Sequence, residues 1–508
     1  MEERKEYFKF DEELFGRLME HDPIYNNYDM SDQGFSRLFT HVNYDFCLYN
    51  TTAKEWFIYN GNVWKRDNGG MTVMDKAEEF YITLIAYSHI IEDEYRKDFF
   101  RKYINSFGKY SRRKTLVEDS RDQCFKSHND FDSNNDLFNC QNGTLNLKTF
   151  EFKEHDYKDL LTKISNVYYD PKATSPLFEK FIGEVMQGDA EKTEYLQKAL
   201  GYALTADTHY ETSFMLYGAT KRNGKSTLMA TIMHALGDYA LDMKPESLAV
   251  KKNVDSRQAS GDLARLDGCR FLNVSEPPKR MLLDITLLKQ MTGRDPITAR
   301  HLHEREFTFY PKFKLFMNTN HLPLVTDDDL FASDRINIIT FDRHFKAREQ
   351  DKTLKDRLIT QENISGIFNW CLQGLHKFID DGLEPPKVVM AATEDYRNDS
   401  DKVGKFIADC LEKTPGENCK AGDVYFIYQT WCDANGYGCE NKANFFAELR
   451  YKKIFADAGT VGDEWYKNIV RGYRINVAKT NPTPPPSDKD APPERNKELE
   501  YIQTEISV

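Results

Sequence analysis

The fold is decided by the stretch Phe214-Met215-Leu216-Tyr217-Gly218-Ala219-Thr220-Lys221-Arg222-Asn223-Gly224-Lys225-Ser226-Thr227-Leu228. An apolar strand leads into a loop with glycine at both ends, and Gly-Lys-Ser then opens a helix that runs to Gly237. Glycines let backbone N–H groups curl around phosphates, and the N-terminus of a helix adds its positive end. The stretch therefore predicts an α/β nucleotide-binding core with a phosphate-binding loop.

The loop supplies the candidate ATP-binding residues. Lys225 is expected to reach the β and γ phosphates, and Ser226 to ligate Mg²⁺. Five residues separate the two glycines, whereas the usual spacing is four. The alternative is a chance Gly-Lys-Ser in a surface turn, but a strand precedes this loop and a helix follows it. The candidates are Gly218, Asn223, Gly224, Lys225, Ser226 and Thr227.

A second predicted strand, residues 270–276, ends in an acidic residue. Pro277 and Pro278 stop this strand just after Glu276. Hydrolysis of ATP requires an acidic residue for Mg²⁺ and a group that positions the attacking water. Glu276 is the candidate for both the metal ligand and the catalytic base. Many such strands end in two acids, so Ser275 leaves open whether one carboxylate serves both roles, and an ordinary strand-end charge is the alternative.

A third predicted strand, residues 313–320, ends in amide side chains. An amide beside the γ phosphate can orient the attacking water, and Asn320 is better placed for this than Asn318 because it is nearer the following loop. Asn320 is therefore a candidate catalytic residue. The alternative is ordinary turn chemistry, since asparagine is common before a proline-containing loop.

An arginine precedes the next predicted strand, residues 336–341. Arg335 is the candidate to act in trans on the γ phosphate bound by a neighbouring subunit, as arginine fingers do. The alternative is a salt bridge at the rim with Asp334 or Asp342.

Composition limits the classes of protein that remain. The chain has 508 residues and a net charge of −12, so we expect about three domains. No stretch approaches the roughly 20 apolar residues that cross a bilayer, and we expect no membrane association. Nine cysteines without a C-x-x-C pair fit free thiols in the cytoplasm. Residues 1–30 carry a net charge of −5 and residues 479–508 a net charge of −2, so the two ends hold more than half of the net negative charge. Contact with DNA must therefore be made by local groups of basic residues and not by the chain as a whole.

Taken in order, these motifs resemble the superfamily 3 helicases, specifically the phage and plasmid primase-associated branch with its virulence-associated and poxvirus-like members. Further matching segments extend the resemblance over about residues 130–478. They are Asn142–Leu147, Tyr169–Pro171, Gly201–Leu204 and Ser365–Trp370. The resemblance implies a P-loop core of the AAA+ type and a ring, expected to be a hexamer, with ATP bound between subunits.

The expected organisation is an α/β ATPase core between an α+β N-terminal domain and a C-terminal winged helix. We predict an N-terminal domain of the primase-helicase type, a helical lead-in that serves oligomerisation, the ATPase domain, a helical segment, a winged-helix-like domain and a proline-rich disordered tail. In that order the predicted boundaries are 1–165, 166–210, 211–345, 346–400, 401–478 and 479–508.

In the resembling family, the segment between the acidic strand and the asparagine strand enters the central channel of the ring. Here residues 297–302 and 307–310 can pair as a hairpin, so His303 and Arg305 at its tip are candidate DNA contacts. A solvated tip without a ligand is the alternative. Lys289 and Arg300 are candidates to face the nucleotide across the subunit boundary.

The C-terminal module has a predicted recognition helix, residues 442–454, and a predicted strand pair around Gly472. Residues 441–476 hold seven basic and four acidic side chains, and this local charge of +3 suits duplex or origin DNA. Docking of a protein is the alternative, since winged helices serve both purposes. The candidate DNA contacts are Arg450, Lys452, Lys453 and Arg471.

The sequence thus predicts an ATP-dependent, ring-forming DNA helicase from a phage, plasmid, virus or other mobile element. It would act in the cytoplasm of a bacterial host or at a viral replication site, with single-stranded DNA in the channel and a separate primase or initiator as further partners. Two alternatives stay open: an origin-binding initiator or scaffold that uses ATP only for assembly, and a P-loop ATPase that remodels other proteins.

Overall fold

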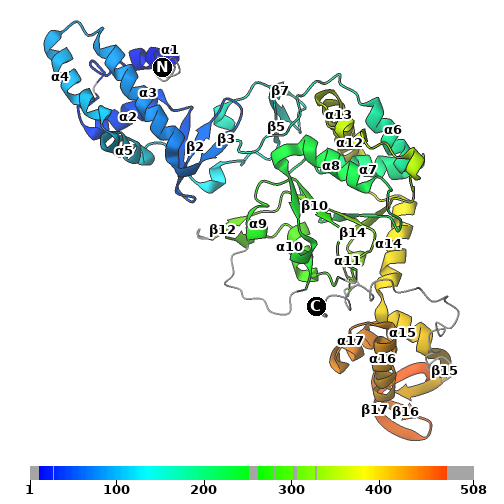
Figure 1. Ribbon diagram of the computed structural model, residues 1–508. Coiled ribbons are helices and arrows are strands. Elements are labelled where there is room, and N and C mark those ends of the chain that lie inside the picture. The colour runs from blue at the N-terminus through cyan, green and yellow to red at the C-terminus, as the bar shows by residue number, and fades with distance from the viewer. Residues whose placement is uncertain are drawn as a thin grey trace, which may run out of the picture. The chain divides into compact units, whose positions relative to one another are not determined.

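The structure is a computed structural model, and it describes residues 11–26, 28–250, 261–279, 281–300, 306–325 and 329–476. The chain divides into two compact units, Met1–Arg397 and Asn398–Val508. Both units combine helices and strands, and the first contains a parallel sheet, so the chain is a mixed α/β protein (Figure 1). Within the described ranges, every helix is too short or too polar to cross a lipid bilayer.

The N-terminal part of the first unit packs helices α1 to α5 with a sheet of order β3-β2-β1-β4. Strands β2 and β3 form an antiparallel hairpin that turns at Asn60-Gly61. Trp64, Phe35 and Phe80 are fully buried and anchor the core. The elements are α1 Glu12–His21, α2 Asp32–Val42, β1 Cys47–Asn50, β2 Glu55–Tyr59, β3 Trp64–Asp67, α3 Met71–Ser88, α4 Glu94–Ile104, α5 Tyr110–Asp119 and β4 Phe125–Lys126.

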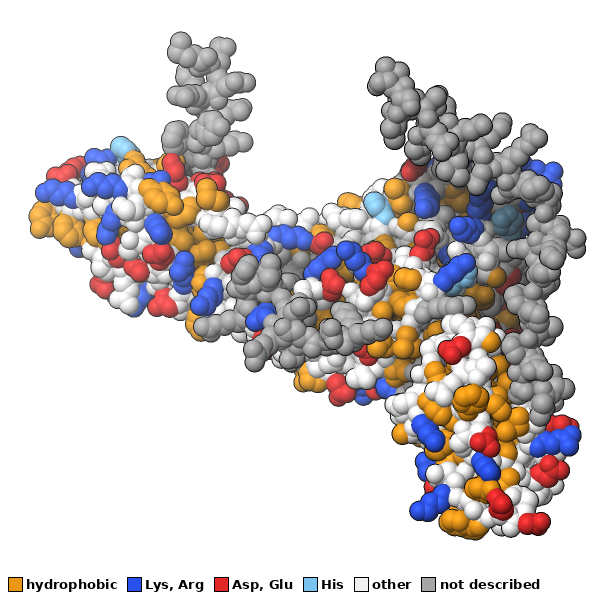
Figure 2. Space-filling model, turned by 60° about the horizontal axis from the view of Figure 1, so that its bottom comes forward, with side chains coloured by type: hydrophobic (Ala, Val, Ile, Leu, Met, Phe, Trp, Pro, Cys, Tyr) orange, Lys and Arg blue, Asp and Glu red, His pale blue; other side chains and the backbone are white. Residues whose placement is uncertain are grey.

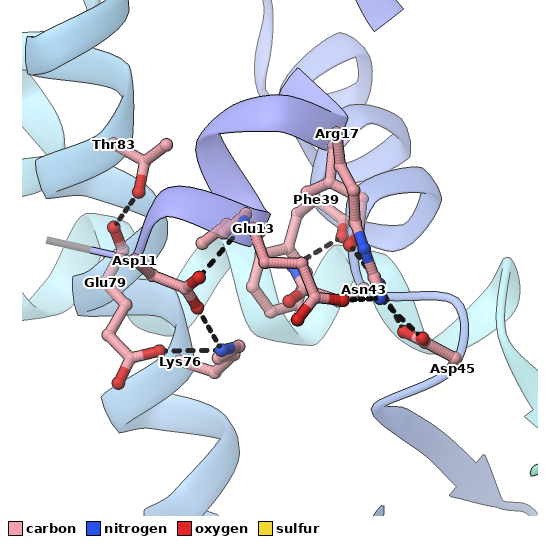
Figure 3. A network of polar contacts seen from close by, with 11 residues as sticks. Asp11, Glu13, Arg17, Phe39, Asn43, Asp45, Lys76, Glu79 and Thr83 are labelled. Atoms are coloured by element: carbon pink, nitrogen blue, oxygen red, sulfur yellow. Dashed lines mark hydrogen bonds and ion pairs between the residues drawn. The ribbon is translucent and has the colours of Figure 1, made fainter. Parts of the chain in front are cut away.

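Polar contacts fasten α1 to its neighbours (Figure 3). Asp11 caps α1 by accepting a hydrogen bond from the backbone N–H of Leu14, and it also accepts one from Lys76 of α3 at 3.1 Å. Arg17 of α1 forms an ion pair with Asp45, which precedes β1. A single helix is therefore tied both to α3 and to the sheet.

A second, smaller sheet and two helices connect this part to the core. The side chain of Ser175 accepts a hydrogen bond from the backbone N–H of Phe178 and so caps α6. Arg270 of the core is buried and donates hydrogen bonds to the carbonyls of Leu137 (2.6 Å) and Leu204 (2.8 Å). The elements are β5 Leu137–Cys140, β6 Gly143–Asn146, β7 Phe152–Lys153, α6 Pro176–Val185 and α7 Ala190–Tyr202.

The core is a parallel sheet of order β14-β8-β13-β10-β9. The strand that precedes the glycine-rich loop, β8, lies between the strands followed by Asn320 and preceded by Arg335. Because all neighbours are parallel, the carboxyl ends of the strands meet at one edge. The elements are β8 Ser213–Tyr217, α8 Lys225–Leu236, β9 Ala240–Met243, α9 Gly261–Ala264, β10 Phe271–Ser275, α10 Ile285–Thr292, β13 Lys314–Thr319, α11 Asp329–Ala332 and β14 Ile336–Thr340.

Alternate residues of the sheet face two separate hydrophobic cores. Phe214 and Phe316 lie in a core with α6, α7, α8 and α13, whereas Met215 and Met317 lie in a core with α10. Both faces are thus buried, which explains the nearly continuous apolar composition of these strands. The helices that follow the sheet are α12 Leu354–Leu358, α13 Gln361–Asp381 and α14 Lys387–Ser400.

The predicted hairpin between the acidic strand and the asparagine strand is present but shorter than expected. Its strands are β11 Ile297–Ala299 and β12 Phe307–Phe309, which pair antiparallel. The predicted contacts His303 and Arg305 lie outside the described residues.

The second unit contains helices and a sheet of order β15-β17-β16. Phe406, Tyr428 and Phe445 are fully buried at its centre. Figure 2 shows hydrophobic side chains among single charged groups on this unit, and elsewhere on the face in view Lys and Arg mix with Asp and Glu. The elements are α15 Lys402–Cys410, β15 Leu411–Lys420, α16 Ala421–Asn435, α17 Lys442–Tyr451, β16 Phe455–Val461 and β17 Glu464–Ile475.

Two details predicted for this unit were wrong. Gly472 does not join two strands: it lies inside β17 with φ +73°, opposite a register shift between Lys413 and Asn418 of β15, as in a β-bulge. The hairpin turn instead lies at Gly462, between β16 and β17. The predicted helix 442–454 also ends earlier than expected, at Tyr451. Strand β15 was not predicted at all, because its Pro-Gly sequence is typical of a turn.

Candidate nucleotide-binding site

The glycine-rich loop joins the end of β8 to the first residue of α8, as the sequence predicts. Gly224 has φ +90°, and a methyl group there would lie 2.6 Å from Cγ2 of Val185 on α6. A methyl group at Gly218 would lie 2.2 Å from Nδ2 of Asn223, which donates a hydrogen bond to the Thr220 carbonyl at 2.7 Å. Both ends of the loop therefore require glycine, and Asn223 holds the loop in its curled form.

Lys225 lies at the start of α8 and is only 4% exposed. Its Nζ donates hydrogen bonds to the Gly218 carbonyl (3.3 Å) and to Oδ1 of Asn320 (2.8 Å), both of which are neutral. Burial lowers the pKa of Lys225 to about 8, while the charge of Glu276 acts in the opposite direction. A buried ammonium with neutral partners favours binding of an anion. Beside it in the first turn, Ser226 is exposed and Thr227 half-buried.

Glu276 directly follows β10, at the same edge of the sheet as the loop. Its backbone N–H donates a hydrogen bond to the Asn318 carbonyl at 3.0 Å, and its side chain is exposed. Its φ of +53° is a left-handed conformation that costs a non-glycine residue roughly 1–2 kcal/mol. The backbone thus turns sharply at this residue, immediately before Pro277.

The two asparagines of the third strand have different partners. Asn320 follows β13 and contacts Lys225, whereas Nδ2 of Asn318 donates to Oδ1 of Asn273 (3.0 Å) and Oγ of Ser275 (2.8 Å). Asn318 is buried in these contacts between β13 and β10. The structure therefore brings Asn320 to the loop. The sequence analysis missed the role of Asn273, although a polar residue inside an apolar strand could have drawn attention to it.

Arg335 lies at the opposite edge of the sheet. Ile336 pairs with Ser213 at the start of β8, so the arginine is near the amino ends of the strands. Its guanidinium forms an ion pair with Glu211 and donates a hydrogen bond to Oγ1 of Thr292 at 2.9 Å. The salt bridge considered with Asp334 or Asp342 was wrong, because the ion pair joins Arg335 to a residue before β8. Arg335 thus does not reach the loop of its own chain.

Of the two candidate interface residues, Lys289 and Arg300, Lys289 contacts Arg335. The backbone carbonyl of Lys289, in the last turn of α10, accepts a hydrogen bond from Arg335 at 3.3 Å. Arg300 directly follows β11 and is half-buried. A role across a subunit boundary stays a prediction for both.

The basic residues predicted to contact DNA in the second unit are partly engaged by acidic neighbours. Arg450 forms an ion pair with Asp457 at 2.7 Å, and Lys452 with Asp401 at 2.5 Å. The side chains of Lys453 and Arg471 are exposed. The predicted DNA surface is therefore less positive than a count of its lysines and arginines suggests.

The segment after β14 forms a further wall of the loop, which the sequence analysis did not predict. The backbone N–H of Phe345 donates a hydrogen bond to the Arg222 carbonyl at 2.9 Å, and Nδ1 of His344 lies 2.8 Å from the Lys221 carbonyl. The guanidinium carbon of Arg343 lies 5.0 Å from the centroid of the Phe345 ring. An aromatic ring and an arginine are thus fixed beside the candidate phosphate site.

Comparison with protein families places these observations in context. The D5 N terminal like family matches residues 36–187, and the Poxvirus D5 protein-like family matches residues 398–479. Two separate segments of the chain are thus similar to domains of D5-type proteins. Between these two segments, a family of unknown function matches residues 216–335, which include Lys225, Glu276 and Asn320. The predicted resemblance to the primase-associated branch of superfamily 3 is thereby confirmed.

Similar curated proteins come from viruses. A protein of Acanthamoeba polyphaga mimivirus, provisionally named a helicase, is 29% identical over 61% of this chain and 34% of its own length. One of Invertebrate iridescent virus 3, also provisionally named a helicase, is 23% identical over 66% of the chain and 40% of its length. One of African swine fever virus, provisionally named a primase, is 20% identical over 60% and 34%. Each match spans less than half of the viral protein.

A search of solved structures finds the apo NrS-1 C terminal region (305–718). It is 11% identical, with a TM-score of 0.47 over 84% of this chain and 96% of that one.

Proposed function

We propose that the chain is an ATP-dependent DNA helicase that works as a ring, with ATP hydrolysed at the boundaries between subunits. The observation that supports this most strongly is the contact between Lys225 and Asn320, which joins the loop to the neighbouring strand at the edge where Glu276 also lies. A buried cation, an amide and a carboxylate there are the groups that positioning and hydrolysis of a phosphoanhydride require.

The residues at this edge fit ATP and Mg²⁺. The loop fits phosphates because its glycines permit close approach and because Lys225 is buried without an anionic hydrogen-bond partner. Ser226 and Glu276 would hold Mg²⁺, which would neutralise charge on the phosphates. Glu276 would accept the proton of the attacking water, and Asn320 would orient that water.

The order of the strands supports an AAA+-like core. Numbered along the core, the sheet has the order five, one, four, three, two, with the loop after the first strand. Arg335 precedes the fifth strand at the edge away from its own loop. We propose that it contacts the ATP of the adjacent subunit in a hexamer, since that location cannot serve its own site.

The second unit has the element order of a winged helix: α15, β15, α16, α17, β16 and β17. We propose that it contacts duplex or origin DNA through the exposed Lys453 and Arg471. Relatives named helicase and primase support a function in replication of viral or other mobile DNA. A separate primase or initiator would then be a further partner.

The decisive experiment measures strand separation on forked DNA, with the mass of the assembly determined in the presence of ATP. We expect ATP-dependent unwinding, a hexameric mass and hydrolysis stimulated by single-stranded DNA. An origin-binding initiator would instead keep DNA binding and origin melting after Glu276→Gln. A protein remodeller would hydrolyse ATP at a rate that single-stranded DNA does not change. Either result would replace the helicase proposal.

A further inference from the structure

Two cavities adjoin at the end of β12, away from the candidate ATP site. Their volumes are about 830 and about 650 Å³, and both are lined by Asn135, Tyr310 and Lys312. Because they share these residues, they form one elongated hollow, which we call the β12 hollow. Sites for compact small molecules measure roughly 300–1,000 Å³. The β12 hollow is larger, so an extended ligand fits it better.

Both walls of the larger cavity belong to the first unit. Residues of β1 to β3 and the segment around His128 form one wall, and β12 with the segment after α9 forms the other. Nε2 of His128 lies 2.7 Å from Oδ2 of Asp267 and so joins the two walls. The Lys65–Asp238 ion pair of 2.5 Å ties β3 to the segment after α8, beside the hollow.

The lining of the hollow favours an anionic ligand. Three of its acidic residues have partners. Asp267 is hydrogen-bonded to His128, and Asp132 accepts a hydrogen bond from Thr162. Asp207 accepts a hydrogen bond from His209. Arg265 and Arg294 are exposed, and Lys163 is half-buried. The basic lining residues are Lys65, Arg66, Lys148, Lys163, Arg265, Arg294 and Lys312, and the acidic ones are Asp132, Asp136, Asp207 and Asp267. Lys65 and Arg66 are themselves ion-paired, so the other five basic lining residues exceed the four acidic ones by one.

Aromatic rings lie between these charges. Tyr310, where the two cavities meet, is 64% exposed although it follows a strand of the core. Phe307 lies 4.9 Å from the ring of His128 and is half-buried. A groove that alternates cations with accessible rings suits a single nucleic acid strand, because phosphates meet the cations and bases stack on the rings.

We propose that the β12 hollow binds single-stranded DNA, with phosphates at Lys163, Arg265 and Lys312 and one base stacked on Tyr310. The choice of DNA rests on the proposed helicase function, whereas the shape and charge of the hollow are independent of it. The hollow would guide the strand along β12, the second strand of the hairpin predicted to contact DNA.

The first test measures binding of a fluorescein-labelled 20-residue oligo-dT to the full chain by anisotropy over a range of salt concentrations. Lys163→Gln with Arg265→Gln removes two phosphate contacts, so the slope of log K against log salt should become shallower by about 1.4. Affinity at about 50 mM salt should fall at least about tenfold. Lys172→Gln, an exposed lysine in the loop before α6, is the matched control and should change neither quantity.

The second test replaces the ring. Tyr310→Ala should weaken oligo-dT binding at least about fivefold, and Tyr310→Phe should restore it, because stacking needs the ring and not the hydroxyl. Unchanged affinity and salt slope in the double variant, or equal losses in Lys172→Gln, would overturn the proposed hollow. Equal losses for Tyr310→Phe and Tyr310→Ala would overturn the stacking contact.

Hydrolysis of ATP by the wild-type chain, measured with and without single-stranded DNA, separates this inference from the proposed function. A chain that hydrolyses ATP but whose oligo-dT binding ignores these substitutions overturns the hollow and leaves the ATPase. A chain that binds oligo-dT through these residues without hydrolysing ATP overturns the ATP-driven helicase and supports the hollow. A wild-type chain that neither binds oligo-dT nor hydrolyses ATP overturns both.

Discussion

Arg335 forms an ion pair with Glu211 at the edge of the sheet opposite the glycine-rich loop. The arginine is 17% exposed and the glutamate 35%, so the pair is partly shielded from water. In a single chain this arginine therefore stabilises the junction of β8, β14 and α10. Any contribution to hydrolysis must occur in a neighbouring subunit.

The pair allows the two roles of Arg335 to be separated. Arg335→Ala should abolish DNA-stimulated hydrolysis, and its subunits should inhibit wild-type rings more than in proportion when the two are mixed. Glu211→Gln breaks the same ion pair and should lower the free energy of unfolding by about 1–2 kcal/mol while hydrolysis continues. Strictly proportional loss of activity in the mixing experiment, or equal loss of turnover in the two variants, would show that the arginine is structural.

Burial of Lys225 predicts a pH dependence of nucleotide binding. Because its pKa is about 8, below the ordinary 10.5, the free chain loses this positive charge as the pH rises through 8. ATP needs the charged form, so its affinity should fall by up to about tenfold per pH unit above 8. Titration with a fluorescent ATP analogue between pH 7 and 9.5 measures this.

Lys225→Met is the control for that titration. It should bind ATP weakly and without this pH dependence, whereas Ser226→Ala should bind weakly and retain it. The lowered pKa also means that burial of the ammonium costs stability below pH 8, a cost that disappears between pH 8 and 10.5. Wild type should therefore gain thermal stability relative to Lys225→Met over that range. An affinity that is flat across pH 8 would mean that this lysine does not contact the phosphates.

The sequence sufficed for features with local causes. The loop was placed correctly because glycines, an apolar strand and a helix follow one another within one stretch, and the prolines after Glu276 mark a strand end wherever the strand lies in the sheet. Asn320 was preferred to Asn318 from its position alone, and the structure gives the reason: Asn318 is occupied by the adjacent strand, whereas Asn320 contacts Lys225.

Features that depend on distant residues were not predictable in this way. The ion-pair partner of Arg335, Glu211, lies 124 residues earlier in the chain and precedes a different strand, so no spacing rule identifies it. Strand β15 is defined by pairing with β17 across a bulge at Gly472, and its own Pro-Gly sequence resembles a turn. The β12 hollow combines segments from the N-terminal sheet, α9 and β12, and only the folded chain brings them together.

The two asparagines of the third strand provide a matched pair of substitutions. Asn320→Ala should reduce turnover by roughly a hundredfold or more with little change in stability, because it removes the group that orients the attacking water. Asn318→Ala should instead lower the free energy of unfolding by about 1–3 kcal/mol, since it leaves Asn273 and Ser275 without their buried partner. Steady-state hydrolysis and chemical denaturation measure the two quantities. If Asn318→Ala reduced turnover more than Asn320→Ala while the two variants were equally stable, Asn318 and not Asn320 would be the residue that orients the attacking water.

Two glycines should respond in opposite ways to the same substitution. At Gly218 the new methyl group would lie 2.6 Å from the Phe341 carbonyl, a backbone atom that can move only with the strand, so Gly218→Ala should displace the loop and weaken ATP binding at least tenfold. Gly183 lies exposed within α6 with nothing within 4 Å of the methyl position, and Gly183→Ala should stabilise the chain by about 0.5–1 kcal/mol without affecting ATP. Thermal unfolding with and without ATP distinguishes these effects. ATP should raise the melting temperatures of wild type and of Gly183→Ala, but not that of Gly218→Ala. Equal protection of both variants by ATP would mean that the Gly218 end of the loop does not contact the nucleotide.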